Sequence, residues 1–313
     1  MVGCLRAPLG AAILVVALAV TAWAQPSYRG MPADALLRAA ERAPQRERPA
    51  ILDALLDNRA AAVGVLRAEA RSGRREAKLT AIALLSEMRD AGAVPALLDA
   101  AADADERVQR NALAALRNIG DARAAQRFRQ LVRQGGVGGA LKIAAAGLGK
   151  LGTAADVGLL RDLLSHPDET VRVTAAGALA MHGNAEGQQV LLVAVDGDNP
   201  VAQKNATYAL GFLQTAEAVA RVQAILADPE GLWKSYAKIA EAQQQRAAQS
   251  ADAELATLTL LGRGRDRVAA DWAIDELTEL DHPDATEVLR ELSTRDDLLG
   301  TKAGLRTRVR EGR

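Results

Sequence analysis

Apolar residues recur along the middle of the chain with a period close to 31 residues. Successive members of each column are separated by 31, 32, 31 and 31 residues. An alanine column holds Ala81, Ala112, Ala144, Ala175 and Ala206, a leucine column holds Leu85, Leu116, Leu148, Leu179 and Leu210, and a third column holds Met88, Ile119, Leu151, His182 and Leu213. The i, i+4, i+7 spacing places the three columns on one face of a helix, because alternating strands would repeat every second residue.

A second helix is predicted in each repeat. Gly120 and Gly152 follow the first stripe and precede a polar residue, a pattern that ends a helix and begins a turn. Beyond the second of these glycines, another apolar stripe with helical spacing holds Val157, Leu160 and Leu164. Each repeat is therefore predicted to be a helical hairpin.

The repeat pattern extends toward both ends of the chain and predicts about eight units. We expect a linker and a capping helix over residues 25–46, repeats over 47–293, and a capping helix with a tail over 294–313. The pattern becomes irregular at 231–267, where helices are expected from Leu232 to about Arg246 and from Asp252 to Leu261. The predicted fold is all-α, a right-handed α-α superhelix in one continuous domain.

These segments resemble a known family of helical repeats. The run at 168–172, Asp-Glu-Thr-Val-Arg, is followed by Ala175, Ala176, Ala178 and Leu179, and this resembles HEAT repeats, particularly the short bacterial form. Tetratricopeptide repeats would show Trp, Tyr and Pro columns that are missing here, and armadillo-like units would add a third helix. The resemblance implies an α-solenoid with an extended concave face built from the second helices, which usually binds proteins or peptides. Eight units at about 10 Å each would span roughly 80 Å.

The N-terminal residues have the features of a secretory signal peptide. Arg6 precedes an apolar run over 11–20, and the small-residue pattern Ala22-Trp23-Ala24 comes before Gln25. We expect cleavage after Ala24 and a periplasmic or secreted mature protein. The apolar stretch of about 14 residues is shorter than the roughly 20 of a spanning helix, so no stable membrane insertion is expected after cleavage. The one cysteine, Cys4, is removed with the signal peptide.

Composition restricts the chemistry that the protein can perform. The chain of 313 residues has 39 basic and 39 acidic side chains, which argues against a nucleic-acid partner. Only 3% of residues are aromatic, and there are three histidines, none of them paired at helical spacing. We therefore expect no catalytic residues, no metal and no cofactor, and a protein or peptide partner, in the envelope if the protein is exported.

The second helices carry a ladder of arginines at matching positions. Arg67, Arg129 and Arg161 share one column, and Arg127 and Arg221 share the neighbouring one. If these positions face the groove, their guanidinium groups would suit carboxylates along an extended acidic or amphipathic partner. The alternative is that the arginines pair with acidic neighbours or extend over apolar surface with their charged ends in water.

The irregular unit supplies two candidate aromatic anchors, Trp233 and Tyr236, which could instead fill a packing defect. The same break in the pattern motivates an alternative function, an accessory or modifying, lyase-like enzyme subunit with a site in 231–267. Basic runs at 71–75, 262–267 and 306–310 motivate a third, an adaptor on nucleic acid or membrane surfaces. On a neutral, exported chain, solvated turns and a charged terminal cap are the favoured explanation of these runs.

Overall fold

The computed structural model describes residues 28–135, 138–228, 232–246 and 250–312, and these residues form helices and turns without β strands. The first half contains α1 (Ala33–Arg42), α2 (Arg48–Asp57), α3 (Arg59–Ser72), α4 (Arg75–Glu87), α5 (Val94–Ala100), α6 (Glu106–Ile119), α7 (Ala125–Gln134), α8 (Gly139–Leu151) and α9 (Val157–Asp162). The second half contains α10 (Glu169–Met181), α11 (Gln188–Val195), α12 (Pro200–Leu210), α13 (Ala216–Ala227), α14 (Lys234–Arg246), α15 (Ala251–Arg263), α16 (Arg267–Glu279), α17 (Ala285–Leu292) and α18 (Leu298–Arg310). The pairs from α2/α3 to α16/α17 are eight hairpins, flanked by α1 and α18, so the predicted all-α repeat fold is confirmed. The predicted signal peptide, 1–24, lies outside the described residues.

The alanine and leucine columns form the core of the solenoid. All ten of these side chains are fully buried between consecutive first helices, and each buried leucine contributes about 2 kcal/mol to stability. The turns follow from local chemistry: Gly120 ends α6 with φ +82°, and the Asp105 carboxylate accepts hydrogen bonds from two backbone N–H groups at the start of that helix.

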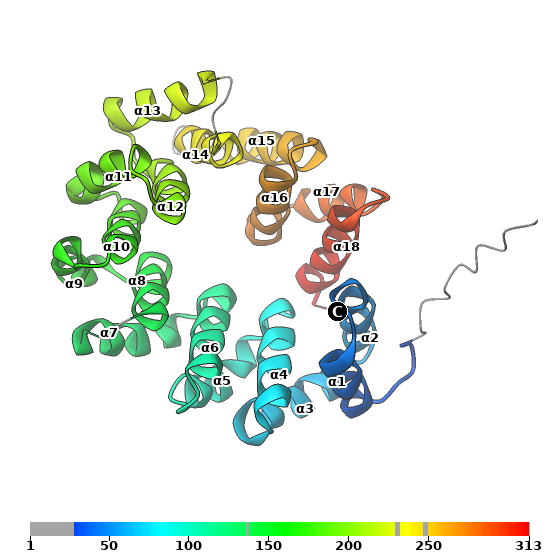
Figure 1. Ribbon diagram of the computed structural model, residues 1–313. Coiled ribbons are helices and arrows are strands. Elements are labelled where there is room, and N and C mark those ends of the chain that lie inside the picture. The colour runs from blue at the N-terminus through cyan, green and yellow to red at the C-terminus, as the bar shows by residue number, and fades with distance from the viewer. Residues whose placement is uncertain (1–27, 136–137, 229–231, 247–249, 313) are drawn as a thin grey trace, which may run out of the picture.

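The two ends of the solenoid meet, and the chain forms a ring (Figure 1). The last helix, α18, packs against α2, and Leu305 contacts the core of the first repeats. At this seam the Arg306 guanidinium donates to the carboxylates of Asp275 and Glu87, at 2.9 and 3.0 Å. Arg308 binds the carboxylates of two aspartates in α2. The basic run at 306–310 therefore forms internal contacts and is not a solvated cap. The expectation of an extended solenoid about 80 Å long is wrong, because the repeats close into a ring.

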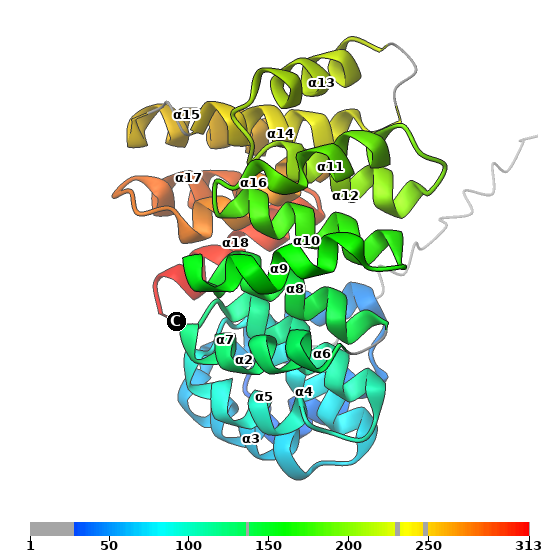
Figure 2. The ribbon, with the colours of Figure 1, turned by 90° about the vertical axis from the view of Figure 1, so that its left-hand side faces the viewer.

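The first helix of each hairpin lines the inside of the ring, and the second helix lies outside. Figure 1 shows α7, α9, α11 and α13 outside α8, α10 and α12, and Figure 2 shows these outer helices stacked one after another. Small residues explain the curvature, because a Cβ on Gly149 would lie 2.8 Å from Cα of Ala178, and one on Gly177 would lie 3.1 Å from Cβ of Ala209. Inner helices that approach so closely shorten the inner layer. The expectation that second helices form the concave face is wrong for this reason.

The seam yields a prediction about ring closure. The Arg306→Ala variant should lose about 2 kcal/mol of unfolding free energy, because a side chain only 9% exposed loses its contacts with Glu87 and Asp275, whose side chains are 56% and 35% exposed. Asp275 keeps its ion pair with Lys302, so Glu87 is the partner left without a cation. Small-angle X-ray scattering should also show a larger radius of gyration, as α18 separates from α2. Arg263→Ala is the control, since Arg263 pairs with Glu291 where both side chains are exposed, and its loss should leave both quantities unchanged. A wild-type radius and melting temperature for Arg306→Ala would contradict the proposed role of the seam.

Candidate functional site

The arginine ladder lies on the outer helices and links consecutive repeats. Arg67 in α3 donates twice to the Asp90 carboxylate, at 2.8 and 2.7 Å, and Arg129 in α7 donates twice to Asp156, at 2.6 and 2.9 Å. Each acidic residue lies in the turn between the two helices of the next repeat. The Asp156 side chain is only 2% exposed, and the hydrogen bonds from Arg129 lower the pKa of this carboxyl. The expectation that these arginines face the concave surface is wrong.

The other members of the ladder are also engaged on the outside. Arg161 donates to the Glu186 carboxylate at 2.7 Å, where both side chains are exposed. Arg221 pairs with Asp196, and Arg127 donates to a backbone carbonyl of the preceding repeat at 2.8 Å. Pairing of this kind was the alternative that the sequence left open, although the partners lie one repeat away. A role for the ladder in partner binding stays a prediction.

Trp233 and Tyr236 pack at the start of α14. The Trp233 indole N–H donates to Oε1 of Gln203 in α12 at 3.2 Å, and the two rings meet edge to face with centroids 6.1 Å apart. The Lys204 ammonium lies 5.8 Å from the centre of the Tyr236 ring. These contacts join α14 to α12, as expected for residues that fill a packing defect. Their role as anchors and an enzyme site in 231–267 stay predictions.

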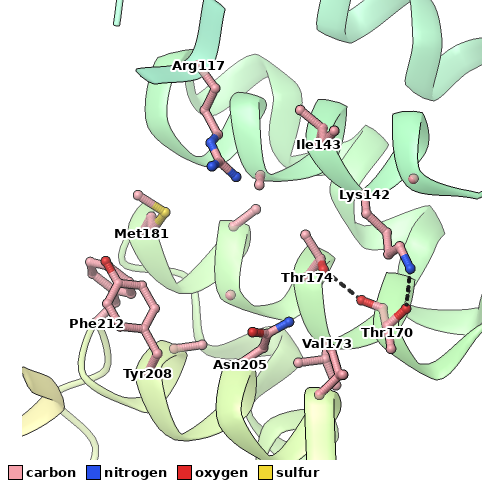
Figure 3. Close-up of a pocket in the computed structure, with 16 residues that line it drawn as sticks. Arg117, Lys142, Ile143, Thr170, Val173, Thr174, Met181, Asn205, Tyr208 and Phe212 are labelled. Atoms are coloured by element: carbon pink, nitrogen blue, oxygen red, sulfur yellow. Dashed lines mark hydrogen bonds between the residues drawn. The ribbon is translucent and has the colours of Figure 1, made fainter. Parts of the chain in front are cut away.

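A groove on the inner wall forms a cavity that could hold a ligand, and the sequence did not predict it. It has a volume of about 470 Å³ and lies along α6, α8, α10 and α12 (Figure 3). Its lining is mainly apolar and includes Ile143, Ala146, Val173, Gly177, Met181 and Phe212. From Thr170 to Met181 the groove follows α10 for roughly 16 Å, at about 1.5 Å per residue.

Small residues create this groove. Two residues after the alanine column, the inner wall carries Ala83, Ala114, Ala146, Gly177 and Tyr208 in successive repeats. The alanine and glycine in α8 and α10 leave space between neighbouring helices, and the tyrosine in α12 fills the corresponding position. Burial raises the pKa of the Tyr208 hydroxyl. The groove therefore has a small-residue floor and an aromatic wall.

Arg117 is the main charged group in the groove. Its guanidinium points into the cavity (Figure 3) and forms no ion pair with any described residue; its one hydrogen bond runs to Oδ1 of Asn118 at 3.5 Å. Burial lowers the pKa of Arg117, although the nearby Tyr208 hydroxyl opposes this. A desolvated cation without a counterion favours an anionic ligand.

Further polar side chains line the groove, among them Asn205 and Lys142. The amide of Asn205 faces the cavity and makes no hydrogen bond within the described part of the chain. Lys142, at the opposite end from Arg117, donates to Oγ1 of Thr170 at 3.0 Å. The arrangement can hold a ligand that has an apolar body, a carboxylate at one end and a group able to form hydrogen bonds between the ends.

Beyond Arg117, charged side chains reach across the ring. Glu279 in α16 binds Arg89 at the end of α4 and Lys150 in α8, the latter at 3.3 Å. Burial raises the pKa of Glu279, but Lys150 and Arg89 lower it by more, so the carboxylate is stabilised in its charged form. Arg117, Lys150 and Glu279 stand at the C-terminal ends of the inner helices α6, α8 and α16, so the bridge lies at the same end of the inner helices as Arg117.

The closed stack of helical hairpins is an α-solenoid, and the chain belongs to the HEAT-repeat family. HEAT-repeat models match residues 63–149, 140–211 and 157–240, which together cover more than half of the chain. The chain is also similar to the crystal structure of an engineered protein, at 22% identity over 89% of this chain and 83% of that one, with a TM-score of 0.44. Human deoxyhypusine hydroxylase in complex with glycerol is 22% identical over 78% of this chain and 94% of its own, with a TM-score of 0.34. No curated protein matched the sequence.

Within the described ranges, no three His, Cys, Asp or Glu side chains come close enough together to hold a metal ion. None of the helices from α1 to α18 combines the length and apolar character needed to cross a bilayer.

The ladder yields a prediction that separates buried from exposed pairs. Arg129→Ala should lower the unfolding free energy by about 2 kcal/mol at pH 7, because it leaves the buried Asp156 carboxylate without a cation. The pKa of Asp156 is lowered in the folded state, so this contribution is present above the ordinary aspartate pKa of about 3.9 and is lost as the pH falls below it. Urea unfolding at pH 7, 5 and 3 measures the difference.

Arg161→Ala is the matched control, because both members of its ion pair are exposed to solvent. It should leave the unfolding free energy unchanged at all three pH values. Equal losses for the two variants, or a loss for Arg129→Ala that grows on acidification, would contradict this account.

Proposed function

We propose that this protein is an exported, non-catalytic scaffold that binds an envelope protein in the inner-wall groove between α8, α10 and α12. The observation that carries the proposal is the half-buried Arg117, which forms no ion pair with any described residue, in a mainly apolar groove. HEAT repeats generally mediate protein–protein interactions, and this chain carries them over most of its length. The binding surface proposed from the sequence, the arginine ladder, is replaced by the inner wall because the ladder's guanidinium groups are already paired.

The dimensions of the groove suit one extended polypeptide strand. An extended chain rises 3.3–3.6 Å per residue, so roughly 16 Å accommodates about five residues. The Asn205 amide offers one donor group and one acceptor, as a peptide group requires. Apolar side chains would contact Ile143, Val173 and Phe212.

Filling the groove should abolish partner binding. In Ala146→Trp, an indole ring would occupy the space above a half-buried alanine on the groove floor. In-cell crosslinking of the tagged protein followed by mass spectrometry should capture an envelope protein with the wild type and at least tenfold less of it with the variant. Val193→Trp, at a 60% exposed position on the outer helix α11, is the matched control and should capture normally. Equal capture by all three forms, with wild-type helicity, would place binding elsewhere.

Export is tested separately. When the chain is expressed with its own N-terminus in a bacterium that has a periplasm, the mature protein should be recovered from the periplasmic fraction or the medium, beginning at Gln25. Ala24→Arg should retain the precursor, because the cleavage position requires a small residue. Mass spectrometry of the intact protein distinguishes the two forms. Recovery of the uncleaved wild type from the cytoplasm would refute export without affecting the groove.

A further inference from the structure

We propose that the groove binds the C-terminal end of its partner, an apolar segment whose free carboxylate binds Arg117. This inference rests on the proposed function and specifies the chemistry of the partner. It follows from three observations: the state of the Arg117 side chain, its place in the groove, and the polar groups between the two ends of the groove.

The first observation is that Arg117 is half-buried in the groove and forms no ion pair with any described residue. The outer arginines Arg67 and Arg129 each make two hydrogen bonds to a carboxylate. Arg117 has only the 3.5 Å hydrogen bond to a neighbouring asparagine. A planar guanidinium binds a carboxylate through two parallel hydrogen bonds, which makes a ligand carboxylate the natural counterion.

The second observation is that Arg117 lies at the end of the groove formed by the C-terminal ends of the inner helices. It faces Met181 and Phe212, at the ends of α10 and α12, whereas Lys142 and Val201 lie where α8 and α12 begin. Val201 is 51% exposed, so this second end is open to solvent. A strand that enters there and reaches Arg117 arrives at the C-terminal ends of the inner helices, the end that also carries the bridge from Glu279 to Lys150 and Arg89. A chain terminus fits this geometry better than an internal segment, which would have to continue past the bridge.

The third observation distinguishes a peptide from an acyl chain. Both could place a carboxylate on Arg117 and an apolar body against Ile143 and Val173. An acyl chain, however, would leave the Asn205 amide without a hydrogen-bond partner in an apolar surrounding, which is unfavourable. A peptide group of the bound segment can both donate to this amide and accept from it. The lining therefore favours a peptide.

Fluorescence anisotropy with defined probes tests the inference. The probes are two pools of N-terminally labelled hexapeptides of random Ala, Val, Leu and Ile, identical except that one has a free C-terminal carboxylate and the other a C-terminal amide. The wild type should bind the acid pool at least tenfold more tightly than the amide pool, as expected for one charged hydrogen-bonded pair. Arg117→Gln should bind both pools alike, at the level of the amide pool on the wild type.

Two variants control for indirect effects. Arg133→Gln removes an exposed arginine from the outer helix α7 and should keep the full preference for the acid pool. Arg117→Lys keeps the positive charge but lacks the two parallel N–H donors of the guanidinium. It should keep part of the preference for the acid pool. Circular dichroism and thermal unfolding establish that each variant is folded.

The outcomes separate this inference from the proposed function. Equal binding of the acid and amide pools, or a preference that survives in Arg117→Gln, overturns the assignment of Arg117 to a C-terminal carboxylate. Binding of dodecanoate that depends on Arg117, with no binding of either peptide pool, overturns it in favour of a lipid. In each case, capture of the envelope protein by the wild type and its loss in Ala146→Trp still decide the proposed function.

Discussion

The contact between the last helix and the first repeats is the constraint on which the rest of the molecule depends. Arg306 joins Asp275 of α16 to Glu87 of α4, residues that belong to opposite ends of the repeat array. Burial raises the pKa of Asp275, but Lys302 and Arg306 lower it by more, so the carboxylate stays charged at the seam. Glu279 lies one helical turn further along α16, and its contacts across the ring require α16 to be held where α18 places it. Closure therefore also determines where the groove ends.

Arg89 shows that this arrangement overrides a local preference. It occupies the column that holds Gly120, Gly152 and Gly183 in the next three repeats, and it has φ +48°, a left-handed conformation that costs a non-glycine residue about 1 to 2 kcal/mol. Its guanidinium binds Glu279 on the opposite wall. A glycine would relieve the strain but could not make this contact, so the ion pair across the ring offsets the backbone cost.

The sequence predicted the helices and the hairpins because burial of the alanine and leucine columns depends only on spacing along the chain. It did not predict the ring, because the contact between Arg306 and Glu87 joins residues 219 positions apart and no periodicity encodes it. It also located the arginine ladder but assigned it to the wrong face. Which layer of a solenoid lies inside depends on how closely the helices of that layer approach one another. Gly149 and Gly177 allow the inner helices to approach closely, and their contacts with the next helix exist only in the folded chain.

The groove itself left a trace in the sequence that becomes interpretable once the inner face is known. Five residues after the alanine column, the repeats carry Ser86, Arg117, Gly149, Ala180 and Gly211, so one arginine stands among small residues. An arginine in such a column projects from the tightly packed inner wall, where water is partly excluded. The outer arginines Arg67 and Arg129 already bind a carboxylate of the next repeat. Arg161 and its partner Glu186 are exposed to solvent, where salt screens their interaction. On a chain with no net charge, the proposed preference for an anionic ligand depends on Arg117, a half-buried cation in the groove that forms no ion pair with any described residue.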